Sequence, residues 1–223
     1  MRSYDQYCAL AKALDVVGDR WTLLIVRELL VRPSRYGELQ DGLTGIATNL
    51  LAERLRQLEG AEVIGRDAES RYELTDRGRK LGAAVQELVR WGAPLMLAGQ
   101  GTDSFRARWL ELPLKLMFGG IDPRRPDIQI EVRTADEMLT LTSAAGAVEV
   151  RTGPAPSPDL VVTGRPELIV GLMSGALDKD VAMSQGVSIL GDFADVERLR
   201  RDDWLTPPID DRPPARTKTS FRG

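Results

Sequence analysis

The sequence predicts two domains of different fold class: a mainly α-helical N-terminal domain that contains a β-hairpin, and a C-terminal α+β domain with a mainly antiparallel sheet. Three observations support this prediction. The chain of 223 residues is longer than most single domains, its first part shows mainly helical periodicity, and a polar, glycine-rich segment precedes several strand-like runs. We expect domains at 1–98 and 105–206, a linker at 99–104 and a flexible tail at 207–223.

The composition excludes several classes of protein. One cysteine cannot form a disulfide within the chain, and the absence of histidine removes the commonest general base and metal ligand. We therefore expect no enzyme, cofactor or metal site. No apolar stretch approaches the roughly 20 residues of a membrane span, which favours a cytoplasmic protein. The net charge is −3, but basic and acidic residues balance over 1–98, so the acidic excess lies in the C-terminal part.

The N-terminal helices follow from the spacing of apolar residues. Helical spacing runs over 8–17 and stops at Gly18, and a second helix is expected at 20–30. A short helix at 36–40, a turn containing glycine and a longer helix at 48–59 come next. This order and spacing predict a helix-turn-helix.

A hairpin and a long helix complete the first domain. Two short strands, 63–66 and 71–74, flank a polar turn. Thr75 is placed to cap a helix over 76–97. A hairpin directly after a helix-turn-helix is typical of a wing, so the sequence predicts a winged helix-turn-helix.

The sequence of the second domain predicts both helices and strands. Helical spacing at the start is followed by runs rich in β-branched residues and then by shorter helices. The expected helices are 105–118, 167–174, 179–184 and 193–200, and the expected strands are 128–133, 138–143, 147–151, 160–163 and 187–191.

The helix expected at 48–59 has one apolar and one polar side. Leu51, Leu55 and Leu58 cluster on the inner side, so the polar side faces outward. Glu53 there has two interpretations: it accepts a hydrogen bond from cytosine, or it pairs with Arg56, which we favour. A solvated helix face and an ordinary hairpin would also fit this pattern. The candidate DNA-binding residues are Arg35, Tyr36, Thr48, Asn49, Ala52, Glu53 and Arg56, with Arg66 and Arg71 in the wing.

Several ordered motifs between Cys8 and Gly92 carry a family resemblance. They are ALDVVGDRWTLLI at 13–25, RELL at 27–30, RYGEL at 35–39, RLRQLE at 54–59 and YELT at 72–75. The chain resembles the bacterial HxlR-type winged-helix regulators, relatives of the MarR group. This implies transcription regulation by a homodimer on double-stranded DNA, at a pseudo-palindromic operator. The expected dimer contacts, some of which must also serve the monomer core, are Leu10, Leu14, Leu81, Val85, Leu88 and Trp91.

Cys8 has two interpretations. The first is a small buried hydrophobic residue, which we favour. The second is a redox sensor, since some members of the resembled family use an N-terminal cysteine in this way; sensing requires an exposed thiol with a lowered pKa.

The region 158–199 resembles the C-terminal half of sterol carrier protein domains. The motifs are DLVVTG at 159–164, LIVGL at 168–172 and SQG at 184–186. Such domains hold lipid-like molecules between a sheet and helices, which implies a small apolar or lipid-like effector. The same residues would also fill a dry core in any α+β domain. The candidate ligand-binding residues are Trp109, Leu112, Leu116, Met117, Phe118, Leu168, Leu172, Met173 and Met183.

Two functions therefore compete. In the first, the chain is a DNA-binding regulator whose affinity for DNA depends on an apolar ligand in the C-terminal domain. In the second, it is a lipid or sterol-like carrier whose winged helix mediates protein association. The polar outer face of the 48–59 helix favours the first. No nucleophile and base at recognisable spacing support an enzyme.

Overall fold

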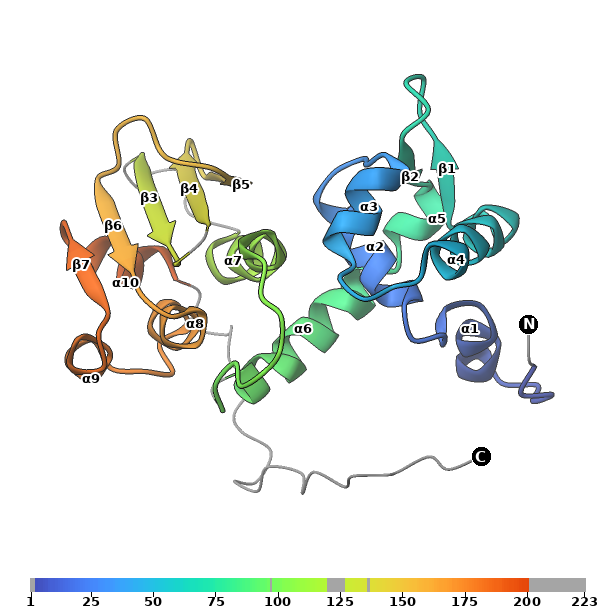
Figure 1. The fold of residues 1–223 in the computed structure, drawn as a ribbon, viewed down its shortest axis with the longest axis horizontal. Helices are drawn as coiled ribbons and strands as arrows, with labels where there is room; N and C mark the ends of the chain where they lie inside the picture. Colours follow the sequence, from blue (N-terminus) through green and yellow to red (C-terminus); the bar gives the residue numbers. More distant parts are fainter. Residues whose placement is uncertain (1–2, 97, 120–126, 136, 201–223) are drawn as a thin grey trace.

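The computed structural model describes residues 3–96, 98–119, 127–135 and 137–200, and it contains two groups of elements joined by a long helix (Figure 1). The tail expected at 207–223 lies outside these residues. In the described residues no helix is both long and apolar enough to cross a membrane. The N-terminal elements are α1 (Ala9–Val17), α2 (Thr22–Val31), α3 (Tyr36–Gly42), α4 (Thr48–Gly60), β1 (Ile64–Arg66), β2 (Tyr72–Leu74), α5 (Asp76–Arg79) and α6 (Gly82–Met96). The C-terminal elements are η1 (Ala107–Leu110), α7 (Glu111–Phe118), β3 (Ile128–Arg133), β4 (Met138–Ala144), β5 (Ala147–Thr152), β6 (Leu160–Thr163), α8 (Pro166–Ser174), α9 (Lys179–Ser184), β7 (Ser188–Leu190) and α10 (Ala194–Leu199).

The N-terminal group is a winged helix-turn-helix, as predicted. Ile25 and Leu29 of α2 share one core with Leu51 and Leu55 of α4 and with the apolar residues of the hairpin. Strands β1 and β2 are antiparallel. The segment before α3 pairs with the hairpin through its backbone. The N–H of Ser34 donates to the carbonyl oxygen of Tyr72 at 2.9 Å, and the N–H of Tyr72 donates to that of Ser34 at 2.8 Å. The hairpin is thereby tied to the start of the helix-turn-helix, and it projects from the domain as a wing (Figure 1).

The helix expected at 76–97 is divided into α5 and α6; residue 97 lies outside the described part. Thr75 Oγ1 accepts the N–H of Gly78 at 3.0 Å, as expected of a helix cap. Gly78 then lies so close to β1 that a Cβ there would be 1.9 Å from the carbonyl oxygen of Val63. This contact fixes the direction of α5 against the hairpin. The chain turns at Lys80 and Leu81 before α6 begins.

The C-terminal sheet has the order β5-β4-β3-β6-β7. All neighbouring strands are antiparallel except β3 and β6, which are parallel, so the sheet is mainly antiparallel, as predicted. Alternate residues Ile128, Ile130 and Val132 of β3 are buried. They share one core with the apolar residues of α7 and α8.

The helix expected at 105–118 is a 3₁₀ turn, η1, followed by the α-helix α7. Pro113 explains the division. Proline has no N–H to donate, and its ring clashes with the carbonyl group four residues earlier, here that of Trp109. An α-helix therefore cannot run from Trp109 through Pro113, although proline is tolerated in the first turn of α7.

The two groups contact each other through α2, α6 and α7. Helix α7 packs against both α2 and α6. Val89 of α6 and Leu116 of α7 touch both hydrophobic cores. The helix-turn-helix and the sheet domain therefore share a packed boundary as well as a connecting segment.

Candidate nucleic-acid interface and ligand cavity

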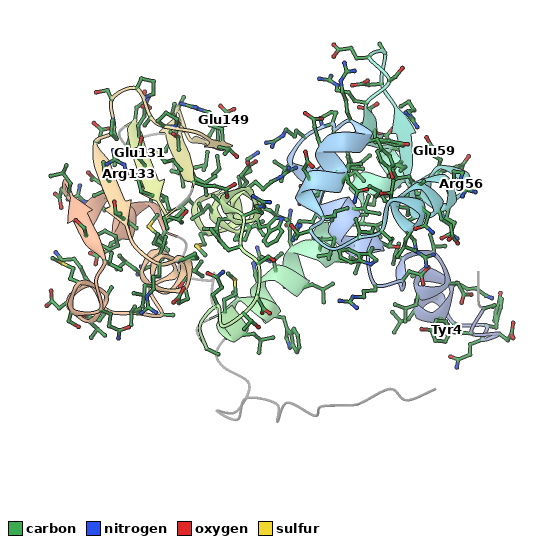
Figure 2. All side chains as sticks on the ribbon, in the orientation of Figure 1. Tyr4, Arg56, Glu59, Glu131, Arg133 and Glu149 are labelled. Atoms are coloured by element: carbon green, nitrogen blue, oxygen red, sulfur yellow. The ribbon has the colours of Figure 1, made fainter. Side chains whose placement is uncertain are left out.

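Helix α4 presents the predicted polar side outward. Thr48, Asn49, Glu53 and Arg56 are exposed and Ala52 is half-buried, while Leu51, Leu55 and Leu58 are buried. Figure 2 shows Arg56 on the outer side of this helix. The first turn of α4 adds backbone N–H groups without helical partners, so small polar side chains and free donors lie together at this end.

Side chains of α3 fix the start of α4. Tyr36 Oη donates to the carbonyl oxygen of Thr48 at 2.7 Å, and Gln40 Nε2 donates to that of Ile46 at 2.8 Å. Tyr36 is half-buried, so in this structure its phenol positions α4. Arg35, immediately before α3, is exposed, and its N–H donates to Glu38 Oε2 at 2.6 Å.

The charged residues of α4 differ from the pairing that we expected. Glu53 accepts from Gln57 Nε2 at 3.0 Å and does not pair with Arg56. Arg54 forms an ion pair with Asp19, which fixes α4 to the segment before α2. Within the described residues Arg56 has neither an ion pair nor a hydrogen bond. Its guanidinium group is therefore available to an external anion.

The wing arginines are both engaged locally. Arg66 lies over the Tyr72 ring, 3.7 Å from its centre, and its Nε is 3.1 Å from Glu59 Oε1. Arg71 pairs with Asp67 at 2.7 Å and with Glu69 at 3.3 Å. Acidic residues therefore hold the guanidinium groups of both candidate DNA-binding residues of the wing in this conformation.

The pKa of Asp67 reflects the same wing contacts. Desolvation raises the pKa, but hydrogen bonds from the Arg71 side chain and from the backbone N–H groups of Arg71 and Glu69 more than offset it. The net pKa is lowered. Asp67 therefore stays charged and offsets the positive charge of Arg71 in the wing.

Comparison with known proteins identifies the family. Residues 16–98 match the family described as HxlR-like helix-turn-helix. The chain is 35% identical over 86 residues to the HTH-type transcriptional regulator YvaP of Bacillus subtilis, and the match covers 80% of YvaP and 36% of this chain. This chain belongs to the HxlR-like helix-turn-helix family.

Other similar proteins carry the same kind of name. The HTH-type transcriptional regulator YodB of Bacillus subtilis is 34% identical over 85 residues, covering 76% of YodB and 35% of this chain. The regulator Rv3095 of Mycobacterium tuberculosis is 41% identical over 90 residues, or 38% of this chain; the match spans 56% of Rv3095, about half its length. The crystal structure of quinone-bound YodB from B. subtilis has a TM-score of 0.36 at 34% identity, covering 39% of this chain and 98% of that chain. These relatives are named transcriptional regulators, which are not enzymes.

Two helices of the HxlR-like domain carry exposed apolar side chains. Leu10 of α1 is 66% exposed, and Leu88 and Trp91 of α6 are 50% and 60% exposed. Leu14 is exposed to a smaller extent. Val85 is buried in the monomer core and Leu81 packs against that core, so these two are the members of the predicted set that serve the monomer. Exposed apolar residues of this domain that the sequence prediction did not include are Tyr4, Tyr7, Leu24, Leu95 and Met96.

Leu95 continues the helical spacing of Leu88 and Trp91, so the same periodicity would have found it. Tyr4 and Tyr7 precede the first helix, where periodicity gives no signal.

Cys8 is exposed, which corrects the favoured interpretation of a buried residue. The residue lies immediately before α1. Hydrogen bonds from the backbone N–H groups of Ala11 and then Leu10 lower the pKa of its thiol, against a smaller desolvation effect. Both properties are those that a thiol sensor requires.

Most of the predicted ligand-binding residues fill packed cores. Phe118, Leu168, Leu172 and Met173 are buried in the C-terminal core, whereas Leu112 is buried in the N-terminal core. Leu116 touches both cores, and Met183 lies exposed on α9. This corrects the expected position of the cavity, because periodicity identifies apolar residues without distinguishing a filled space from an open one.

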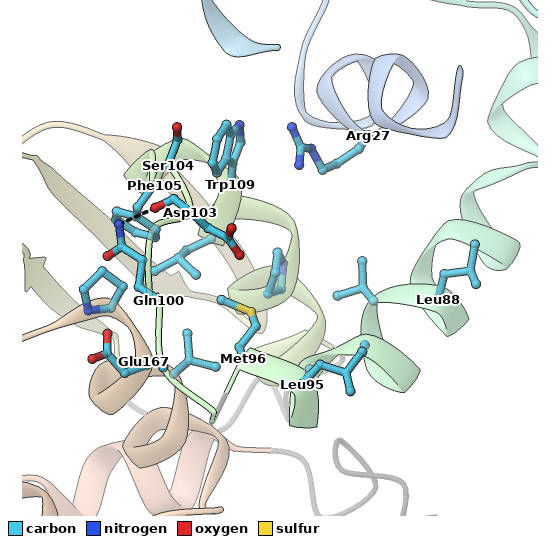
Figure 3. A pocket seen from close by; sticks show the side chains of 18 of the residues that line it. Arg27, Leu88, Leu95, Met96, Gln100, Asp103, Ser104, Phe105, Trp109 and Glu167 are labelled. Carbon is cyan, nitrogen blue, oxygen red and sulfur yellow. Dashed lines mark hydrogen bonds between the residues drawn. The ribbon is translucent and has the colours of Figure 1, made fainter. Parts of the chain in front are cut away.

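A cavity of about 450 Å³ lies at the boundary between the two domains (Figure 3). Of the nine predicted ligand-binding residues, Trp109 and Met117 line it. Its other walls come from α6, from the linker and from the start of α8. Figure 3 shows Leu88 and Leu95 on one side and Glu167 on the other.

Two buried carboxylates are paired across the same boundary. Glu28 of α2 lies 2.5 Å from Arg108 Nη2 of η1. In the opposite direction, Glu111 of α7 lies 3.2 Å from Arg32 Nη1, which follows α2. Thr152 Oγ1 also donates to Glu111 at 2.7 Å. Each domain therefore supplies an arginine to a buried glutamate of the other.

Trp109 connects the cavity wall to the helix-turn-helix. Its Nε1 donates to the carbonyl oxygen of Gly42, the last residue of α3, at 3.0 Å. Arg27 lies over the Trp109 ring, 5.2 Å from its centre, and donates through Nη2 to Glu28 at 2.6 Å. Burial lowers the pKa of Arg27, whereas Glu28 raises it. A molecule that touches Arg27 and Trp109 would therefore contact groups joined to α2 and α3.

Proposed function

We propose that this chain is a dimeric, DNA-binding transcriptional regulator whose affinity for DNA is modulated by a small apolar ligand. The observation that carries the proposal is the exposed polar side of α4, where Thr48 and Asn49 lie at the helix N-terminus and Arg56 is unpaired within the described residues. Small polar groups there suit phosphates and base edges, and an arginine one or two turns along suits guanine or phosphate.

The exposed apolar side chains of α1 and α6 support a dimer. Leu10, Leu88 and Trp91 would cost free energy if they stayed in water, and a second copy would cover them. Winged helices that read two half-sites need two copies.

The proposal is tested by gel shift and footprinting with the full chain on fragments from upstream of its own gene. We expect a protected site with two-fold symmetry. Arg56→Ala should weaken binding by about tenfold, because one base or phosphate contact is lost. Arg77→Ala is the matched control: this exposed arginine of α5 lies off the α4 face, and its loss should change affinity by less than about twofold.

Two outcomes would contradict the proposal that the chain is a DNA-binding regulator. One is that no fragment is retarded even at low salt; the other is an equal effect of the two arginine variants. The absence of DNA binding together with tight uptake of a fluorescent fatty acid would favour the carrier alternative.

We propose that the second domain is sterol-carrier-like and supplies part of the ligand site, as its resemblance implies. Helices α7 and α8 pack with the five-stranded sheet in one core, which agrees with the expected arrangement of helices and sheet. The cavity at the domain boundary, partly walled by α7 and α8, is the space that we assign to the ligand.

A second candidate function is oxidant sensing by Cys8, which its exposure and the lowered pKa of its thiol favour. The thiolate is the reactive form, so a lowered pKa increases reactivity at neutral pH. We expect diamide to change the DNA affinity of the unmodified chain, and dithiothreitol to reverse the change. Cys8→Ser should bind DNA normally in reducing buffer and ignore diamide. An unchanged diamide response in Cys8→Ser would eliminate this function.

A further inference from the structure

We propose that the cavity at the domain boundary binds a small apolar molecule that carries a protonated amine, with Glu167 as the acceptor. The inference rests on the proposed function, because it names the class of ligand that would modulate the regulator. It also moves the site from the interior of the second domain to the space between α6, the linker and α8.

The walls of the cavity suit an apolar body. Its apolar lining includes Val89 and Ala93 of α6 and Phe105, Met117 and Val170 of the second domain. A volume of about 450 Å³ lies within the range of small-molecule sites, which is about 300–1,000 Å³. Flexible methionine and aromatic side chains also adapt to guests of irregular shape.

One polar group in the wall has an unused hydrogen-bonding position. Glu167 Oε2 is buried and has no hydrogen-bond partner within the described residues. The Glu167 side chain is only 12% exposed, and its other oxygen, Oε1, is 3.1 Å from Arg165 Nη1. A buried acceptor without a donor is unfavourable, and the penalty is larger for a charged group. Glu167 lines the cavity, and a rotation of its side chain would bring Oε2 to a ligand donor and remove that penalty.

The charges around the cavity favour a cation over an anion. The lining contains three charged residues, Arg27, Asp103 and Glu167. Behind the wall, Glu28 pairs with both Arg27 and Arg108, and the exposed Arg165 contacts one oxygen of Glu167. Asp103 has no ion pair within the described residues. The lining residues themselves therefore carry one positive and two negative charges, which favours an ammonium group over a carboxylate.

The experiment compares three probes of one shape by isothermal titration calorimetry on the full chain without DNA. They are 1-naphthylmethylamine, which is protonated at pH 7, neutral 1-naphthylmethanol and anionic 1-naphthoate. We expect the amine to bind about tenfold more tightly than the alcohol, and the carboxylate to bind most weakly, because a charge-assisted hydrogen bond is the stronger kind.

Variants locate the site. Glu167→Gln keeps the shape of the side chain and should weaken the amine about tenfold while leaving the alcohol within about threefold. At Gly92 a Cβ would meet no atom within 4 Å, so Gly92→Phe should fill the cavity and abolish binding of every probe without a backbone clash. Glu149→Gln, on an exposed strand of the sheet, is the matched control and should change nothing.

Equal affinity for the three probes, no binding at all, or loss of the amine preference in Asp103→Asn instead of Glu167→Gln would each overturn the assignment. Circular dichroism checks that each variant is folded. Because the titration contains no DNA, these failures are distinct from failure of the proposed function. A protein that retards DNA but ignores the amine refutes only the cavity assignment.

Discussion

At the scale of single residues, Glu131 shows how a buried charge is kept stable. Glu131 is buried in β3, where it accepts the N–H of Ala155 at 2.6 Å and a bond from Arg133 Nε at 2.5 Å. Desolvation raises the pKa of Glu131. The hydrogen bonds from Ala155 and Arg133 lower the pKa by more than this, so the net pKa lies below its ordinary value. The charged form of Glu131 therefore stabilises the fold at pH values above the ordinary pKa of a glutamate. This contribution is lost as pH falls through the folded pKa.

Glu131→Gln should lower the free energy of unfolding at pH 7 by about 1–3 kcal/mol, because a charge-assisted contact with Arg133 is lost. Urea unfolding should also show a weaker decline in stability between about pH 5 and pH 3 than in the unmodified chain. Glu149→Gln, an exposed substitution on β5, should leave both quantities nearly unchanged. Parallel pH curves for Glu131→Gln and the unmodified chain would contradict this account.

Sequence reasoning found the outward residues of α4 because helical periodicity separates Thr48 and Arg56 from Leu51 and Leu55. It did not find the partners of Glu53, Arg66 or Arg71. Those partners depend on where neighbouring long side chains fold, and periodicity carries no such information. The exposure of Cys8 was missed for a related reason: it depends on what packs around the start of α1.

At the scale of elements, helical spacing alone does not predict the break between α5 and α6. The apolar spacing of Leu81, Val85 and Leu88 is helical throughout, so one continuous helix was the natural prediction. At the turn the N–H of Lys80 donates to Arg77 and that of Leu81 to Gly78, three residues back instead of four. Gly78 itself lies against Val63, a tertiary contact that helical spacing does not report.

Gly78→Ala should therefore destabilise the N-terminal domain by about 1–3 kcal/mol, because the new methyl group overlaps the Val63 carbonyl oxygen and the hairpin must shift. Thermal unfolding measures the effect. Gly60→Ala is the control: a Cβ there meets no atom within 4 Å, so the change should be neutral or slightly stabilising. Similar behaviour of the two variants would show that the close contact does not constrain α5.

At the scale of the whole molecule, the two domains are joined by reciprocal ion pairs. Glu28 forms an ion pair with Arg108, and Glu111 forms one with Arg32. The sequence predicted both domains and most of their elements, because each has its own periodicity. It did not predict how they meet, since contacts such as that of Trp109 with Gly42 join residues that are distant in sequence.

Arg108→Met should lower the free energy of unfolding by about 1–3 kcal/mol; the effect is moderated because Arg27 remains on Glu28. The same variant should reduce any ligand effect on DNA affinity, measured by gel shift with and without 1-naphthylmethylamine. Arg106→Met, at an exposed position with only a 4.0 Å pair to Glu137, is the matched control. An equal loss of stability in both variants would show that the buried pair does not couple the domains.

The parallel pairing of β3 with β6 also has a consequence during synthesis. Strands β3, β4 and β5 are neighbours in sequence and can pair as soon as they leave the ribosome, whereas β6 completes the other edge of β3 only after a crossover. Until then the nascent sheet carries an open backbone edge beside Ile130 and Val132. An open edge can pair with the edge of another chain, so a chain that ended after β5 would be prone to aggregate.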